Sequence, residues 1–202
     1  MNLTRMLKVS RLEGLSDGIF AIAMTILVLD LRVPLGTALA DLPAVLHSSL
    51  LIKLLIYAGS FIILGTQWVA MNFQLGLIQR VNRPYLWANI FYLMVVCVIP
   101  FSATLVAAYP NSPLSISFYA INLLCTSIGQ VGTSQFAHIY KLNTDVYTPA
   151  IRAAILKRIC VGPIFNCAGI VLAYWNTSIA FAVLVVPTFF YMFPGIVDNI
   201  KD

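Results

Sequence analysis

Six long apolar stretches, separated by short polar or turn-rich pieces, constrain this chain more than any other feature. They cover residues 12–31, 47–71, 85–109, 114–139, 150–174 and 177–197. A helix needs about 20 apolar residues to cross a hydrocarbon core of ~30 Å, and each stretch reaches that length. None alternates apolar and polar residues as a β-barrel strand does. The pattern therefore predicts an all-α integral membrane protein with six transmembrane helices.

The composition agrees with a membrane chain. Of 202 residues, 60% are hydrophobic and 9% are charged, and the mean hydropathy is +0.92, whereas about 25% of the residues of a soluble domain are charged. No internal repeat or low-complexity segment divides the sequence. We therefore expect residues 1–202 to form a single six-helix subunit.

The basic residues predict the orientation of the helices. Ten of the twelve lysines and arginines fall at the two ends of the chain, in the second and fourth loops or just after the fourth loop, and only Arg32 and Lys53 fall on the other side. Positive charge stays in the cytoplasm, so both termini should be cytoplasmic, in a multi-pass protein of the cell inner membrane. The net charge of +5 thus reflects topology and attraction for anionic lipid, not nucleic-acid binding.

An alternative for the amino end is a signal peptide, in which three basic residues precede an apolar core and the cleavage-like Ala38-Leu39-Ala40. Glu13, Asp17 and Asp30 interrupt that pattern.

The motifs of enzymes and of cofactor or metal sites are not found. The sequence contains no HExxH, GxSxG, P-loop or paired-acid pattern, and no CxxC or Cys/His spacing for a metal. Its four cysteines all lie within apolar stretches and are expected to be packed, reduced thiols. The potassium-filter run TVGYG is also missing. We expect neither an enzyme nor a cofactor.

The first apolar stretch carries polar groups at membrane depth. Counting about 20 residues back from Arg32 places Ser16 and Asp17, with Glu13, at or inside the membrane edge. A carboxylate there must face protein, water or a cation. One interpretation is an ion-pair cluster with the arginines at 80, 83, 152 and 158. The alternative is a proton-carrying site at Asp17.

One face of the same helix could line a pore. Gly18, Ile22, Thr25, Ile26 and Leu29 share that face through steps of three and four residues. Ordinary helix packing produces the same pattern, so the spacing alone leaves both interpretations open.

A family resemblance favours the pore. Arg11-x-x-x-Leu15-Ser16-Asp17-x-x-Phe20 resembles the R-x-x-x-F-S-D-x-x-F signature of the transmembrane-protein-175 family, potassium channels of endosomes and lysosomes with prokaryotic homologues. The run from Gly18 to Asp30 is similar to the first helix of that family. Tyr57-Ala-Gly-Ser60 with Trp68 resembles its second helix, and Asn89 to Thr104 its third, so the resemblance covers about the first 110 residues.

The resemblance implies a homotetramer of six-helix subunits with the first helix around the pore. By alignment, the hydrophobic constriction falls on Ile22, with Ile26 and Leu29 further out, and a selectivity hydroxyl layer falls on Thr25. Transient K⁺ would lie near Ile22 and Thr25. A structural network would comprise Arg11, Ser16, Asp17, Phe20, Trp68 and Asn72. Two departures are Leu15 for the signature phenylalanine, and Met71-Asn72 where relatives often carry histidine.

The leading hypothesis is therefore a potassium-selective cation channel that uses a hydrophobic constriction in place of a carbonyl filter. Asp30, at the pore mouth, would concentrate cations there. One alternative is a proton- or ion-coupled secondary transporter that uses Asp17 or Asp30. A membrane scaffold without transport activity is the other.

Overall fold

The computed structural model describes residues 8–32, 43 and 50–192. These form α1 (Val9–Ile26), the short 3₁₀ helix η2 (Leu27–Asp30), α3 (Leu51–Gly76), α4 (Arg83–Cys97), α5 (Ile99–Ala108), α6 (Pro113–Ile139), α7 (Pro149–Ile159), α8 (Val161–Ala173) and α9 (Thr177–Met192). The prediction of an all-α protein is confirmed. Residues 38–40, the expected second-helix start at 47, and residues 193–197 lie outside the described part of the chain.

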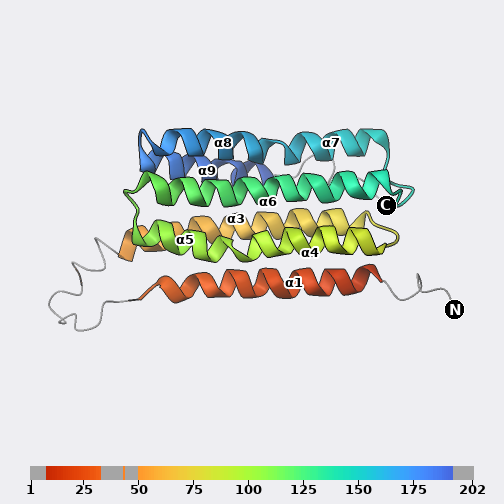
Figure 1. Ribbon diagram of the computed structural model, residues 1–202, viewed down its shortest axis with the longest axis horizontal. Helices are drawn as coiled ribbons and strands as arrows, with labels where there is room; N and C mark the ends of the chain where they lie inside the picture. Colours follow the sequence, from red (N-terminus) through yellow and green to blue (C-terminus); the bar gives the residue numbers. More distant parts are fainter. Residues whose placement is uncertain (1–7, 33–42, 44–49, 193–202) are drawn as a thin grey trace.

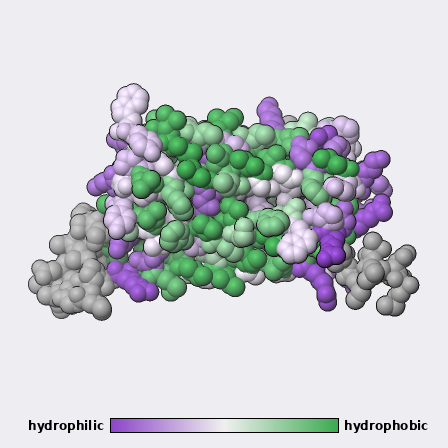
Figure 2. All heavy atoms as spheres, viewed as in Figure 1, coloured by the Kyte–Doolittle hydropathy of each residue, from purple (hydrophilic) through white to green (hydrophobic). Residues whose placement is uncertain are grey.

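The helices are long and apolar enough for a multi-pass membrane protein. Within residues 8–32 and 50–192, five spans meet that length: Val9–Asp30, Leu51–Gly76, Arg83–Ala108, Pro113–Ile139 and Pro149–Ala173. The sixth apolar helix, α9, is described over 16 residues. All run along the long axis of the molecule (Figure 1). Hydrophilic side chains gather at the two ends of that axis, and hydrophobic ones dominate between them (Figure 2).

Two of the predicted single helices are broken. The third stretch divides into α4 and α5 at Val98, and the fifth into α7 and α8 at Cys160. A proline follows each break within the next helical turn, Pro100 in α5 and Pro163 in α8. Because proline has no N–H, the helical hydrogen bond to the carbonyl four residues earlier is lost at both places. Each pair of helices together is still long and apolar enough to cross a membrane as one span.

Polar residues between the stretches start the helices, as their position in the sequence suggests. Asn82 Oδ1 accepts a hydrogen bond from the backbone N–H of Tyr85 at 2.8 Å, at the start of α4. Asn176 Oδ1 accepts from the N–H of Ile179 at 3.0 Å, at the start of α9. Such caps satisfy N–H groups that have no partner within the helix.

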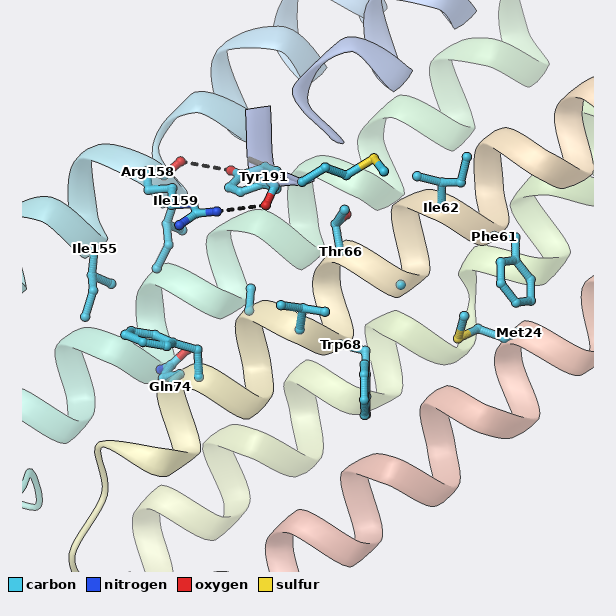
Figure 3. Close-up of a pocket in the computed structure, with 15 residues that line it drawn as sticks. Met24, Phe61, Ile62, Thr66, Trp68, Gln74, Ile155, Arg158, Ile159 and Tyr191 are labelled. Carbon is cyan, nitrogen blue, oxygen red and sulfur yellow. Dashed lines mark hydrogen bonds between the residues drawn. The ribbon is translucent and has the colours of Figure 1, made fainter. Parts of the chain in front are cut away.

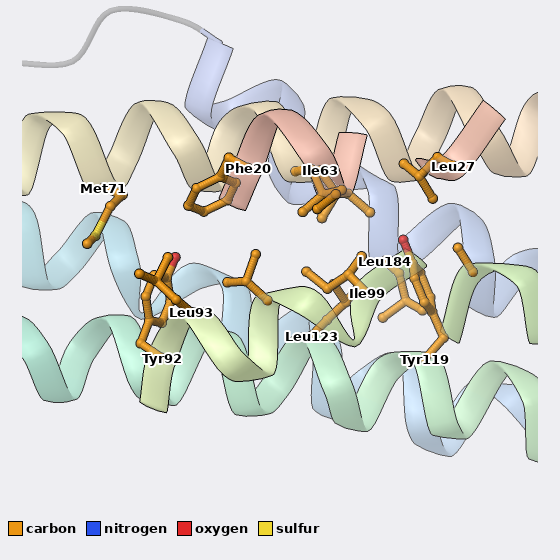
Figure 4. Packing of buried hydrophobic residues seen from close by; sticks show 14 of the residues in the cluster. Phe20, Leu27, Ile63, Met71, Tyr92, Leu93, Ile99, Tyr119, Leu123 and Leu184 are labelled. Carbon is orange, nitrogen blue, oxygen red and sulfur yellow. The ribbon is translucent and has the colours of Figure 1, made fainter. Parts of the chain in front are cut away.

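The helices form layers, and α1 lies on the outer flank. Next to it come α3 and the pair α4–α5, and α6 to α9 lie beyond (Figure 1). Phe20 of α1 and Leu27 of η2 belong to the same buried cluster as Ile63 of α3 and Leu93 of α4 (Figure 4). The α1 helix is therefore attached to the rest of the subunit along one side.

The expectation that the cysteines are packed inside the protein is wrong for the subunit. Cys97, Cys125, Cys160 and Cys167 are free thiols, and all are exposed on its surface. In a membrane the outer surface is as apolar as the core, so an apolar neighbourhood in the sequence does not distinguish the two.

Candidate functional site

The α1 helix has two faces of different character. Its buried side chains are Leu12, Ser16, Phe20 and Ala23, and Leu27 of η2 continues the same row. They recur every three or four residues and so form one stripe along the helix. This stripe packs against α3, α4 and α5. The opposite face has no cover from the described part of the subunit.

The uncovered face is the one that the sequence singled out. Ile22 is 61% exposed, Leu29 55% and Ile26 45%, and Thr25 between them is also exposed. A Cβ atom built at Gly14 or Gly18 would meet no atom within 4 Å. In a membrane, such a face meets lipid, water or other copies of the chain.

The hydroxyl of Thr25 is oriented by its own helix. Oγ1 lies 3.0 Å from the carbonyl oxygen of Ala21 and 2.9 Å from that of Ile22, and donates to them. A hydroxyl has one proton and two lone pairs. Since the proton points at the backbone, the oxygen remains an acceptor on the exposed face. It can receive a hydrogen bond from water or contact a cation.

Asp17 bonds to a tryptophan, not to an arginine. The indole Nε1–H of Trp68 on α3 donates to Asp17 Oδ1 at 2.8 Å, and Asn72 Nδ2 donates to the carbonyl of Trp68 at 3.3 Å. The expected ion pair of Asp17 with a distant arginine is not formed in the described part of the chain. Of the four arginines considered, Arg152 bonds instead to His138 and Gln135.

The remaining residues of the expected network differ in their surroundings. Ser16 is buried and its Oγ donates to the carbonyl of Leu12 at 2.8 Å, which keeps the hydroxyl within α1. Phe20 is fully buried in the core. Arg11 is exposed on the surface of the subunit. The structure thus brings Asp17 and Trp68 together, whereas Asn72 bonds only to the backbone of its own helix and Arg11 has no described bond to any of them.

A second carboxylate ties the other end of this span to α5. Thr104 Oγ1 donates a hydrogen bond to Asp30 Oδ2 and also lies 3.0 Å from the carbonyl of Pro100. Arg32 Nε donates to the carbonyl of Leu29 at 2.8 Å. Both carboxylates of the span from Val9 to Asp30 that face neighbouring helices therefore anchor it, one to α3 and one to α5.

Sequence reasoning missed a polar interior on α6. Its buried polar residues are Ser115, Ser117, Asn122, Thr126, Ser127, Gln130, Thr133 and Ser134. A cavity of about 30 Å³ between α3, α6, α8 and α9 is lined by Gln67, Ser127, Gln130 and Thr188, among others. The signal was available, because hydroxyl and amide side chains recur at helical spacing through 115–134. These groups carry no charge, so they suit helix–helix hydrogen bonds.

No group of histidine, cysteine and acidic side chains in the described ranges could hold a metal ion. The described part of the chain is a helical bundle of membrane-spanning length, with an apolar, hydroxyl-bearing helix face left open on one flank. That architecture defines a multi-pass membrane protein whose first helix is available for assembly or for lining a pore.

Comparison with known proteins supports the family resemblance. Residues 11–100 match the family model described as "Endosomal/lysosomal potassium channel TMEM175". The resemblance seen in the first helix is thereby confirmed over these residues.

Individual relatives agree with this match to the family model. A potassium channel of Chryseobacterium is 32% identical over 58% of this chain, and the match spans 59% of that channel's length. The crystal structure of a lysosomal potassium-selective channel TMEM175 homolog from Chamaesiphon minutus matches with a TM-score of 0.77 and 27% identity, covering 91% of this chain and 96% of the other. A more distant zebrafish relative, 24% identical over 67% of this chain and 26% of its own length, is named an endosomal/lysosomal proton channel.

Proposed function

We propose that four copies of this chain form a potassium-selective cation channel, with the α1 helices arranged around a central axis. The observation that carries the proposal is the open face of α1 and η2, where Ile22, Thr25 and Leu29 are exposed although the opposite face is tightly packed. The potassium channels among its relatives support the choice of ion. Each subunit would be one six-helix unit covering residues 1–202.

The constriction in this proposal is hydrophobic. Four copies of Ile22 would form a ring too narrow and too apolar to hold a continuous column of water, so ions could not cross it until it widened. Ile26 and Leu29 would narrow the outer part of the route. No carbonyl filter is required, because the barrier is dewetting and not coordination.

Selectivity would come from the Thr25 layer. Four hydroxyl oxygens, each with its proton directed at its own backbone, would present lone pairs to a partly dehydrated cation. Potassium gives up hydration water more readily than sodium, so the layer would favour potassium modestly. Asp30 would add negative charge at the outer mouth and raise the local cation concentration.

The constriction is tested by potassium flux into proteoliposomes. Ile22→Ala widens the ring and Ile22→Asn wets it, so both should raise the flux several-fold. Ile128→Ala is the matched control, because Ile128 is also an exposed isoleucine, 57% exposed, but on α6. Equal flux for wild type and both Ile22 variants would remove Ile22 as the constriction. No flux from any of them would favour a scaffold over a channel.

The selectivity layer is tested by reversal potentials under a potassium–sodium gradient. Thr25→Ala should shift the reversal potential toward that of a non-selective cation pore, and Thr25→Ser, which keeps the hydroxyl, should not. An unchanged value for Thr25→Ala would refute the role of Thr25. Native mass spectrometry of the detergent-solubilised complex tests the tetramer, and a mass other than four subunits would overturn it.

A second candidate is proton movement, with or without a coupled ion. The name of the zebrafish relative favours it, and Asp17 and Asp30 are the carboxylates of the first span that could carry the proton. A proton-coupled transporter predicts saturable flux that requires a co-ion and disappears in Asp17→Asn or Asp30→Asn. A channel predicts flux that stays linear in the ion gradient.

In the proposed orientation, the channel lies in the inner membrane of the cell and both termini lie in the cytoplasm. Its support is the distribution of ten of the twelve basic residues on that side. Terminal epitope tags should be protected from protease in intact, outer-membrane-permeabilised cells, and cleavage of both tags would reverse the orientation.

A further inference from the structure

The small cavity between α3, α6, α8 and α9 lies inside the subunit, near the middle of its spans. Ser127 lines it, and this residue is about 20 Å from either end of α6 at 1.5 Å per residue. Bulk water at the two membrane surfaces is therefore far away. The described wall of the cavity includes no residue of α1, so the cavity is separate from the proposed constriction.

A layer of side chains separates the cavity from the outside of the bundle. Thr66, Ala70 and Tyr191 line both the cavity and a larger apolar groove of about 500 Å³ between α3 and the α7 and α9 helices. Figure 3 shows Tyr191 in this layer, where its OH donates to the carbonyl of Arg158 at 2.9 Å and its own carbonyl accepts from Arg158 Nη2 at 2.8 Å. In a membrane the groove meets hydrocarbon, which offers no hydrogen bonds to the polar groups behind it.

A buried amide group of α6 lacks a partner at this cavity. Gln130 lines the cavity and is only 5% exposed, and its Nε2 has no hydrogen-bond partner in the described part of the chain. A buried donor without an acceptor destabilises a fold, and most of all in hydrocarbon, where no water replaces the lost bond. The cavity therefore calls for an acceptor next to Gln130.

The hydroxyl groups around the cavity offer acceptors and not donors. Thr66, Ser127 and Thr188 each donate their hydroxyl proton to a carbonyl three or four residues earlier in their own helix, at 2.8, 2.9 and 2.6 Å. A hydroxyl has one proton and two lone pairs, so each oxygen can still accept a hydrogen bond. Ser127 Oγ already accepts one, from Asn166 Nδ2 at 3.1 Å. A ligand that joined these oxygens to Gln130 Nε2 would have to accept and donate at once.

A proline interrupts α9 beside the same cavity. Pro187 lines it and lies inside the helix Thr177–Met192. Because proline has no N–H, the carbonyl four residues earlier loses its helical hydrogen bond. In membrane helices such a carbonyl is satisfied by a neighbouring side chain or by an ordered water. The interruption of α9 is thus a second, independent reason to expect a small hydrogen-bonding ligand here.

We propose that this cavity binds one or two water molecules as a fixed part of the fold. Its volume of about 30 Å³ exceeds the roughly 10–15 Å³ that one water needs. Gln130 Nε2 would donate to the water, and the water would donate to the oxygen of Ser127 or Thr188. The described wall contains no carboxylate, so a cation would have no opposite charge there. The bound water would join α6 to α9 halfway through the membrane.

The test is X-ray radiolytic labelling of the protein in lipid nanodiscs, read by peptide mass spectrometry. Radiolysis of a bound water produces a hydroxyl radical that oxidises the side chains in contact with it. Leu123 and Leu184 line the cavity and are each 2% exposed, whereas Leu93 is 1% exposed and does not line it. Leu123 and Leu184 should be oxidised several-fold faster than Leu93. Equal rates for the three leucines would show a dry cavity and overturn the proposal.

A variant of Gln130 tests which group holds the water. Gln130→Leu replaces the amide by an apolar side chain of similar size and helix propensity. It should lower the Tm and reduce the oxidation of Leu123 and Leu184 to the rate of Leu93. In a dry cavity the same variant would raise the Tm, because it removes an unsatisfied amide.

Ser117→Ala is the matched control for Gln130→Leu. Ser117 is also on α6 and 5% exposed, and its Oγ has no partner in the described ranges, but it does not line this cavity. Its replacement should leave the labelling unchanged and should not lower the Tm. A higher Tm for Gln130→Leu, or leucine labelling as fast as in wild type, would overturn the assignment of the water to Gln130. Neither measurement depends on ion flux, so its outcome is independent of the proposed channel.

Discussion

Replacing Gly169 by alanine should loosen the contact between α8 and α9, which holds that side of the bundle together. A Cβ built at Gly169 would lie 2.9 Å from Cγ of Leu184 and closer still to its Cδ2. Carbon atoms prefer separations of about 3.5–4.0 Å, so the two helices or the Leu184 side chain would have to give way by about 1 Å. Leu184 is only 2% exposed and has little room to turn.

The change in the free energy of unfolding caused by Gly169→Ala follows from two opposing effects. Forcing an extra methyl into a packed site costs about 1–3 kcal/mol. Alanine in place of glycine inside a helix gains up to about 1 kcal/mol. Gly132→Ala on α6 isolates the second effect, because a Cβ there would meet no atom within 4 Å. We therefore expect Gly169→Ala to be less stable than Gly132→Ala by about 1–3 kcal/mol, the steric cost alone.

The assay is thermal unfolding of the detergent-solubilised protein, with Leu184→Ala added to complete a double-mutant cycle. Alone, Leu184→Ala should cost about 2–5 kcal/mol. In the Gly169→Ala background it should cost less by the amount of the steric penalty, because it removes the side chain that the new methyl meets. Equal stability of the two alanine variants, together with additive effects in the cycle, would refute the close approach of α8 and α9.

Two further predictions concern hydrogen bonds between helices. Trp68→Phe and Asp17→Asn should each lower the free energy of unfolding by about 1 kcal/mol, because each weakens the same hydrogen bond between α1 and α3. The double variant should lose little more than either single variant. Additive losses would show that the two residues act separately. Ser60 Oγ and Tyr119 OH lie 2.9 Å apart, and both residues are buried. Ser60→Ala and Tyr119→Phe should each lower the free energy of unfolding by about 1–3 kcal/mol, because each leaves the other hydroxyl without its partner. Thermal unfolding of the double variant should show less than the sum, and full additivity would contradict the bond.

The sequence predicted the spans better than their interruptions. Apolar length is local information, so the helices could be found from it, and the caps at Asn82 and Asn176 fall where the polar breaks were expected. The divisions at Val98 and Cys160 were not expected. In both, a proline sits in the first turn of the following helix, where it is tolerated and where the apolar pattern continues through it.

Side-chain partners were harder to predict than spans, because they depend on which helices pack together. The carboxylate of Asp17 suggested an arginine by charge alone, but α1 packs on α3, and there the available donor is the indole of Trp68. The polar interior of α6 was missed for a related reason. In a membrane, polar side chains turn inward, so the polar face of a helix marks its contact with other helices and not its exposed side.

The two anchored carboxylates bear on how the proposed constriction could widen. Asp17 is held to α3 by Trp68, and Asp30 is held to α5 by Thr104, about 20 Å further along the helix axis. Ile22 lies between these two anchors and on the opposite side of the helix from the packed stripe. A rotation of α1 alone that turned Ile22 away from the axis would carry both carboxylates off their donors and unpack Phe20 from the core. A movement in which α3 and α5 travel with α1 keeps every one of these contacts, so widening of the ring by displacement of whole subunits is energetically the easier route.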